Sequence, residues 1–150
     1  MKIQQLSLFL ENKPGQMIEP CRLLARSGVS ILALTLADTQ HFGLMRLIVS
    51  DAQRSRALLE EAGYLVNVTE VVAIEVTDTP GGLSELLELF EASGERPGVN
   101  IEYMYAFTFG RHDRAVMIFR FEDADLAMER LRGSGRNALG DIELSDRISV

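Results

Sequence analysis

Two short loops of the chain combine residue types that can hold a small charged group. They read Asn-Lys-Pro-Gly-Gln-Met at 12–17 and Asp-Thr-Pro-Gly-Gly-Leu at 78–83, and each precedes an expected helix. Unpaired N–H groups and the helix dipole favour an anion at a helix start, and glycine has no Cβ to keep a ligand from the backbone. An Asn amide both donates and accepts hydrogen bonds, whereas an ionised Asp only accepts. Both loops therefore suit a ligand with a carboxylate or an ammonium group.

The same residues have a second interpretation that needs no ligand. Asn12 and Asp78 are good helix-capping or Asx-turn residues in any protein. Ser30 and Asn100 open later strands and could serve only as polar residues of an edge strand. The loops alone favour the capping interpretation, whereas the loops together with these strand starts favour a ligand site.

Hydrophobic periodicity predicts the order β-α-β-β-α-β over residues 1–70. The expected strands are 2–10, 29–37, 44–50 and 64–71, and the expected helices are 17–27 and 52–63. The first helix has its apolar stripe at Met17, Cys21, Leu24 and Ala25. Pro20 lies within this helix and removes a backbone hydrogen bond unless it falls in the first turn.

The same order is expected over residues 71–150. The predicted strands are 71–78, 99–109, 115–121 and 141–148, and the second helix is 123–133. The first helix of this half is predicted from an apolar face at helical spacing, formed by Leu83, Leu86, Leu87 and Phe90.

The two halves are related by a slowly drifting offset. Pro14 and Pro80 are 66 positions apart, the Val-(Ser/Asn)-Ile segments at 29–31 and 99–101 are 70 apart, and the segments at 49–51 and 121–123 are 72 apart. Retained element order with a drifting offset indicates a duplicated unit. The predicted class is α+β, with two ferredoxin-like βαββαβ units at 1–70 and 71–150, antiparallel sheets and helices on one face.

The strand Ile31–Ala37 is apolar on both of its faces. One face of the strand must pack against the helices, and the other face would be exposed to solvent in an isolated open sandwich. We therefore expect the two units to pack as a pseudo-dimer, or to pack on a second chain.

Composition and charge limit the partners. The chain has 150 residues, of which 47% are hydrophobic and 25% charged, with one cysteine and a net charge of −7. All of the excess acidic charge lies in residues 71–150. No apolar run approaches the roughly 20 residues that span a bilayer, and acidic chains repel phosphate backbones. We expect a cytoplasmic protein with no membrane or nucleic-acid partner.

The repeated units, the (Asn/Asp)-x-Pro-Gly-x-(Leu/Met) loops and the Gly-Val-(Asn/Ser)-Ile segments at 98–101 and 28–31 make the sequence similar to tandem ACT-domain proteins. The resemblance covers nearly the whole chain. It implies a free-standing regulatory or sensor protein of amino-acid metabolism that binds an amino acid. It also implies a homo-oligomer, such as a dimer, and a regulated enzyme as partner.

In ACT pairs the ligand touches the loop of one unit and the second strand of another. Carried over, the stronger pocket consists of Asn12, Lys13, Pro14, Gly15, Gln16, Met17, Asn100 and Ile101. The weaker pocket consists of Asp78, Gly81, Gly82, Leu83, Ser30 and Ile31. An ionised Asp78 would repel a ligand carboxylate, so the pocket with two amides is expected to bind better.

The other candidate residues favour ordinary structural roles. Cys21 lies on an apolar stripe and is expected to be a buried, inert thiol. His41 and His112 fall in turns with no partner at metal spacing. Tyr103, Tyr105, Phe107 and Phe109 resemble the base-stacking row of RNA-binding sheets, but they lie on the second strand of an acidic unit, which favours packing.

Three function classes stay open. The first is a non-catalytic amino-acid sensor, and the second is a ligand-free assembly or docking module for a partner enzyme. An enzyme is the third, but the sequence has no nucleophile–base pair, metal cluster or phosphate loop. We expect no catalytic residue, no metal and no cofactor. The sequence does not identify the amino acid, the partner or the pathway.

Overall fold

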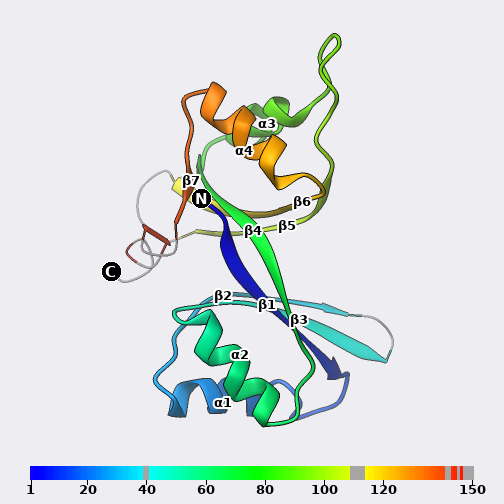
Figure 1. Cartoon of the computed structure of the whole chain (residues 1–150), viewed down its shortest axis with the longest axis vertical. Helices are drawn as coiled ribbons and strands as arrows, with labels where there is room; N and C mark the ends of the chain where they lie inside the picture. The colour runs from blue at the N-terminus through cyan, green and yellow to red at the C-terminus, as the bar shows by residue number, and fades with distance from the viewer. Residues whose placement is uncertain (39–40, 109–113, 141–142, 145, 147–150) are drawn as a thin grey trace. The chain divides into compact units, whose positions relative to one another are not determined.

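A computed structural model describes residues 1–150 except 39–40, 109–113, 141–142, 145 and 147–150 (Figure 1). The chain divides into two compact units. Residues Gln4–Thr69 form the amino-terminal unit, and Glu70–Val150 together with Met1–Ile3 form the carboxyl-terminal unit. Each unit is described by itself.

The amino-terminal unit has the predicted order of elements. They are β1 (Ile3–Glu11), α1 (Ile18–Arg26), β2 (Ile31–Asp38), β3 (Phe42–Val49), α2 (Ala52–Glu61) and the start of β4 (Val66–Thr77). The strand order is β2-β3-β1-β4, and β3 pairs antiparallel with both β1 and β2. This order is that of a ferredoxin-like sheet.

Alternate residues of β1 and β3 form the core of this unit. Leu6 and Leu8 lie opposite Leu47 and Met45, and all four side chains are fully buried. They pack in one cluster with Leu24 of α1 and Leu59 of α2. Helices α1 and α2 therefore cover the same face of the sheet (Figure 1).

The carboxyl-terminal unit repeats the plan. Its elements are the end of β4, α3 (Gly82–Leu87), the 3-10 helix η1 (Glu88–Phe90), β5 (Ile101–Thr108), β6 (Arg114–Phe121), α4 (Ala124–Gly133) and β7 (Ala138–Leu139). The strand order is β4-β6-β5, and β7 pairs antiparallel with β4. Three rings, Phe90, Phe119 and Phe121, lie at the centre of its core.

The duplication extends to individual hydrogen bonds. The carboxylate of Asp51 caps α2 by accepting from the backbone N–H of Arg54 at 3.0 Å, and Asp123 caps α4 by accepting from that of Leu126 at 2.9 Å. These two caps are 72 positions apart, as the sequence offset predicts. The fold class predicted from the repeat is confirmed.

The expected last strand at 141–148 is wrong where the structure describes it. The paired strand is the earlier segment Ala138–Leu139, and Glu143, Leu144 and Asp146 are helical. The backbone N–H of Leu144 donates to the Gly140 carbonyl at 2.9 Å, and that of Gly140 donates to the Glu143 carboxylate at 2.8 Å. This local turn ends the strand, and the alternation of apolar residues after it does not reveal the turn.

The helix preceding each second strand also differs from expectation. In α1 the buried residues are Pro20 and Leu24, whereas Met17 and Ala25 of the expected stripe are exposed. Pro20 lies in the first turn, where no backbone hydrogen bond is lost. Leu86 and Phe90 are buried as predicted, but α3 ends at Leu87 and Leu83 is exposed.

Candidate functional site

The loop at 12–17 forms a largely exposed, hydrogen-bonded turn before α1. The Asn12 N–H donates to the carbonyl of His41 at 3.2 Å, and the Gln16 N–H donates to that of Lys13 at 3.3 Å. Gly15 has φ +87°, a conformation that favours glycine, and the space where a Cβ would stand is empty. The N-cap of α1 is Met17, without a side-chain cap. Asn12 is therefore not the cap of α1, and the helix-capping interpretation is wrong, whereas the Asx-turn interpretation stays a prediction.

The loop at 78–83 is more tightly built. Gly81 has φ +91° and is itself the N-cap of α3, again without a side-chain cap, so Asp78 does not cap this helix either. A Cβ at Gly82 would overlap the backbone oxygen of Thr77. The Ser84 hydroxyl donates to the Gly81 carbonyl at 2.9 Å. Here helix and strand approach too closely for any residue larger than glycine.

The backbone just before β2 and just before β5 is fixed by equivalent hydrogen bonds. The Ser30 carbonyl accepts from the N–H of Ser50 at 2.9 Å, and the Asn100 carbonyl accepts from that of Glu122 at 3.0 Å. Ser30 and Asn100 are both exposed. The backbone is thus fixed at each position while the side chain stays available.

Strand register places the two motifs of one unit at opposite ends of its sheet. In the carboxyl-terminal unit, Arg114 lies opposite Thr77, next to the loop, and Phe121 lies opposite Ile101, next to Asn100. Arg114 and Phe121 are seven positions apart on β6, which is about 23 Å at about 3.3 Å per residue. A small molecule therefore cannot touch both motifs of this unit.

The amino-terminal unit has the same separation. Phe42 lies opposite Glu11, and Val49 lies opposite Ile31, again seven positions apart on β3. A site that uses one loop and one strand start must take them from two units, in one chain or in two chains.

The predicted pocket residues are distributed accordingly. Asn12, Lys13, Pro14, Gly15, Gln16, Met17, Ser30 and Ile31 lie in the amino-terminal unit, and Asp78, Gly81, Gly82, Leu83, Asn100 and Ile101 lie in the carboxyl-terminal unit. Each motif is intact within its unit. The pairing of Asn12 with Asn100, and of Asp78 with Ser30, stays a prediction.

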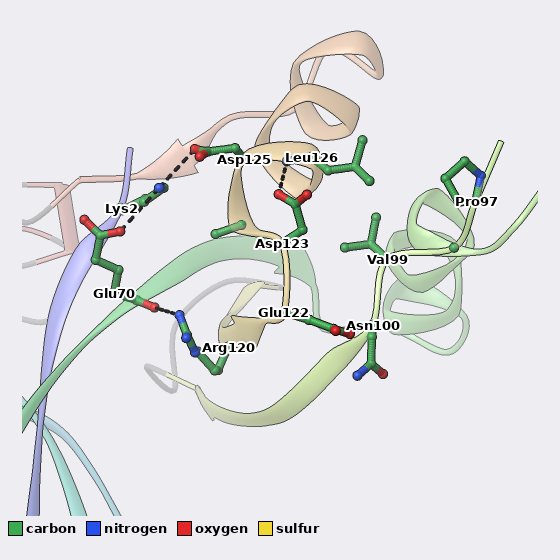
Figure 2. A pocket seen from close by; sticks show the side chains of 12 residues that line it. Lys2, Glu70, Pro97, Val99, Asn100, Arg120, Glu122, Asp123, Asp125 and Leu126 are labelled. Atoms are coloured by element: carbon green, nitrogen blue, oxygen red, sulfur yellow. Dashed lines mark hydrogen bonds and ion pairs between the residues drawn. The ribbon is translucent and has the colours of Figure 1, made fainter.

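Asn100 lies on an open groove of about 630 Å³ in the carboxyl-terminal unit (Figure 2). The Lys2 ammonium bridges two carboxylates on this groove, with Glu70 at 3.3 Å and Asp125 at 3.0 Å. Arg120 donates to Glu102 at 2.8 Å and to the backbone oxygen of Glu70 at 3.1 Å. The Lys2 ion pairs tie the start of the chain to β4 and α4, and the Arg120 contacts tie β6 to β5 and β4.

The sequence did not predict this charged groove. An acidic cluster directly after β6 could have indicated the groove from the sequence; it consists of Glu122, Asp123 and Asp125. Lys2 has no such signal, because it reaches Asp125 across more than a hundred positions of sequence.

Alkaline pH should destabilise the protein through two groups. The hydrogen bond to Asp125, and then that to Glu70, raises the pKa of Lys2 above 10.5. Burial, followed by the charge of Glu19, raises the pKa of Tyr64 above 10.0. A pKa raised by folding contributes stability that is complete below the unfolded value and is lost as pH rises through the folded value. The free energy of unfolding should therefore fall above about pH 10.

Urea titrations from about pH 8 to about pH 11 measure this slope. Tyr64→Phe and Lys2→Met should each remove part of it, and an unchanged slope in both variants would contradict the assignment. The Lys2 side chain is only partly buried, so added salt should reduce its share.

Three further expectations concern residues outside the loops. Cys21 is a free thiol, but it is half-buried rather than buried. His41 is exposed next to β3, and His112 lies outside the described residues. The aromatic residues Tyr103, Tyr105 and Phe107 are half-buried on β5, opposite Arg120, Ile118 and Val116, and Phe109 lies outside the described part of the chain.

Within the described residues, no group of His, Cys, Asp and Glu side chains could hold a metal ion. No helix in that part of the chain is long and apolar enough to cross a membrane.

Two βαββαβ units with matched loops, strand starts and helix caps define a duplicated ferredoxin-like protein. Residues 1–146 match the ACT domain pair family, and the chain belongs to that family, which confirms the resemblance.

Solved structures share the fold. The fold is similar to that of protein BT0572 from Bacteroides thetaiotaomicron, with 34% identity and a TM-score of 0.87, over 100% of this chain and 98% of that one. The ligand-free regulatory subunit of aspartate kinase from Thermus thermophilus shares the fold at 17% identity and a TM-score of 0.61, over 87% and 91% of the two chains. No curated protein matches the sequence.

Proposed function

We propose that this chain is a non-catalytic regulatory protein that binds a free amino acid. It belongs to the ACT domain pair family, and a protein with the same fold is named as a regulatory subunit. The observation that carries the proposal is the register in each unit, because it separates the loop and the strand start that the ligand would use. Binding then joins two units, which is how a small molecule can control an assembly.

The chemistry of the stronger pocket suits an amino acid. The first turn of α1 has no side-chain cap, so its N–H groups and dipole can receive the ligand carboxylate. The open space beside Gly15 lets the carboxylate approach the backbone. The amides of Asn12 and Asn100 can donate to the carboxylate and accept from the ammonium group.

The second pocket is the weaker one in this proposal. Its loop brings the Asp78 carboxylate in place of an amide, and Gly82 is packed against β4. The residue at the position of Gly82 in the first loop is Gln16, which is only half-buried. The space beside the preceding glycine is open in both loops, at Gly15 and at Gly81, so the weaker binding proposed for the second pocket rests on the charge of Asp78.

A thermal-shift screen of the twenty amino acids tests the proposal, because a ligand of the folded state raises its stability by mass action. The absence of stabilisation by all twenty would refute amino-acid binding and favour the alternative, a ligand-free assembly module that docks on a partner enzyme.

Titration calorimetry with the amino acid found in the screen then locates the site. Asn12→Ala and Asn100→Ala should each weaken binding about ten- to a hundred-fold, since a lost hydrogen bond to a charged group costs about 1.5–3 kcal/mol. Asn137→Ala, at an exposed position outside both pockets, is the matched control. If Asp78→Ala abolished binding and both pocket Asn variants retained it, the other pocket would be the site.

The proposal includes three further points. The protein acts in the cytoplasm, it self-associates as a homodimer, and it regulates an enzyme of amino-acid metabolism. The family and the exposed strand starts support association, and the ligand would act on that association.

A further inference from the structure

Arg130 is a buried arginine whose guanidinium donates hydrogen bonds to backbone carbonyls rather than to a carboxylate. It lies on α4 and is 8% exposed. Its guanidinium donates to the backbone oxygens of Leu89 and Glu91, each at 3.3 Å, and to that of Pro97. No ion pair of Arg130 occurs among the described residues. A desolvated guanidinium is retained at a cost, so these three contacts need an explanation.

Leu89 lies in η1, and the other two acceptors, Glu91 and Pro97, lie on the segment that joins η1 to β5. This segment is where the carboxyl-terminal unit has the four residues that the amino-terminal unit lacks, as the change of offset from 66 to 70 shows. The counterpart of Arg130 at the helix offset of 72 is Leu58 on α2. The arginine therefore occurs in the unit that has the extra residues, and an apolar residue takes its place in the other unit.

The segment that Arg130 binds leads directly to Asn100 along the chain. The Val99 N–H donates to the Phe90 carbonyl at 2.7 Å, and the Asn100 carbonyl accepts from the N–H of Glu122 at 3.0 Å. Only two residues separate Pro97, whose carbonyl Arg130 binds, from Asn100. Pro97, Val99 and Asn100 follow one another along the same groove (Figure 2).

We infer that Arg130 is a positioning residue for the ligand site: it fixes the segment 91–97 and so holds Asn100 in its binding position. This inference rests on the proposed function. The planar guanidinium fork can hold several carbonyls at once, whereas the ammonium group of lysine acts as a point charge. Without the fork, Asn100 occupies its binding position for only a fraction of the time, and the apparent affinity falls by that fraction.

The test uses the full chain with Arg130→Lys and Arg130→Met, and with Arg132→Met as a control at an exposed arginine of the same helix. Both Arg130 variants should show faster amide hydrogen exchange over 91–100, with exchange in β4 and β6 unchanged. Calorimetry with the amino acid identified by the screen should give about tenfold weaker binding. The control should match the wild type in both measurements.

The decisive variant combines Arg130→Lys with Asn100→Ala. If Arg130 acts through Asn100, the lysine substitution should weaken binding no further in the Asn100→Ala background. An equal loss in both backgrounds, unchanged affinity in Arg130→Lys, or unchanged exchange over 91–100 overturns the inference. Lack of binding by the wild type overturns the proposed function, and the ligand role of Arg130 with it.

Discussion

Phe119→Ala is expected to lower the free energy of unfolding by about 3–5 kcal/mol, the range for removing a buried aromatic side chain. Phe119 is fully buried. Its ring centroid lies 5.3 Å from that of Phe121, in a stacked arrangement, and 6.1 Å from that of Phe90. The substitution removes one ring of this cluster and leaves a cavity between β6 and η1, because close-packed neighbours relax only in part.

Urea unfolding of the two proteins, followed by circular dichroism, measures the loss. Phe9→Ala is the matched control, since it makes the same chemical change at a ring that is 47% exposed. We expect about 1.5 kcal/mol or less for the control. A similar loss in both variants would contradict the assignment of the three-ring cluster as the core.

Gly82→Ala is expected to destabilise the protein by about 3 kcal/mol, at the upper end of the range for overpacking. The added Cβ would overlap the backbone oxygen of Thr77, and the Thr77 carbonyl carbon would lie 3.1 Å away. Thr77 is held in β4 opposite Arg114, so the strand cannot easily move aside. The loop and the start of α3 must shift instead.

The same substitution at Gly133 is the control for Gly82. Gly133 is the last residue of α4, and nothing lies within 4 Å of the place where its Cβ would be. Because alanine favours the helix, Gly133→Ala should leave stability unchanged or raise it by up to about 1 kcal/mol. A mild effect at Gly82, similar to that at Gly133, would show that the loop is not closely packed against β4.

The repeated order of elements was predictable because each unit has regular apolar patterns. Leu6, Leu8 and Leu10 alternate as a strand must when helices cover one face, and they form the core as expected. The offsets between the halves anticipate the matching caps at Asp51 and Asp123. In these cases the pattern and the local hydrogen bonds favour the same structure.

The errors occurred where a local hydrogen bond decides the structure and hydrophobicity does not. The turn from Gly140 to Leu144 replaces the expected last strand. The capping interpretation failed because the helices begin at Ile18 and Gly82, after the polar residues of the loops rather than next to them. Periodicity locates a helix but does not fix its first residue.

The charged contacts were not predictable for a different reason. Lys2 pairs with Asp125, and Arg130 binds carbonyls more than thirty positions away. Polar residues carry no periodic signal for such partners, so a buried arginine on an amphipathic helix looks like any exposed arginine.

Under the proposed function, the separation of loop and strand start gives each unit a direction, with a different half of the ligand site at either end. Two units that point in opposite directions form two complete sites and leave no half-site unpaired, as in a closed isologous pair. Two units that face the same way complete one site and leave a half-site at each end, to which further units could add as in an open heterologous assembly. Under the proposed function, the number of amino acids bound per chain, measured together with the size of the assembly, would therefore report the relative direction of the units.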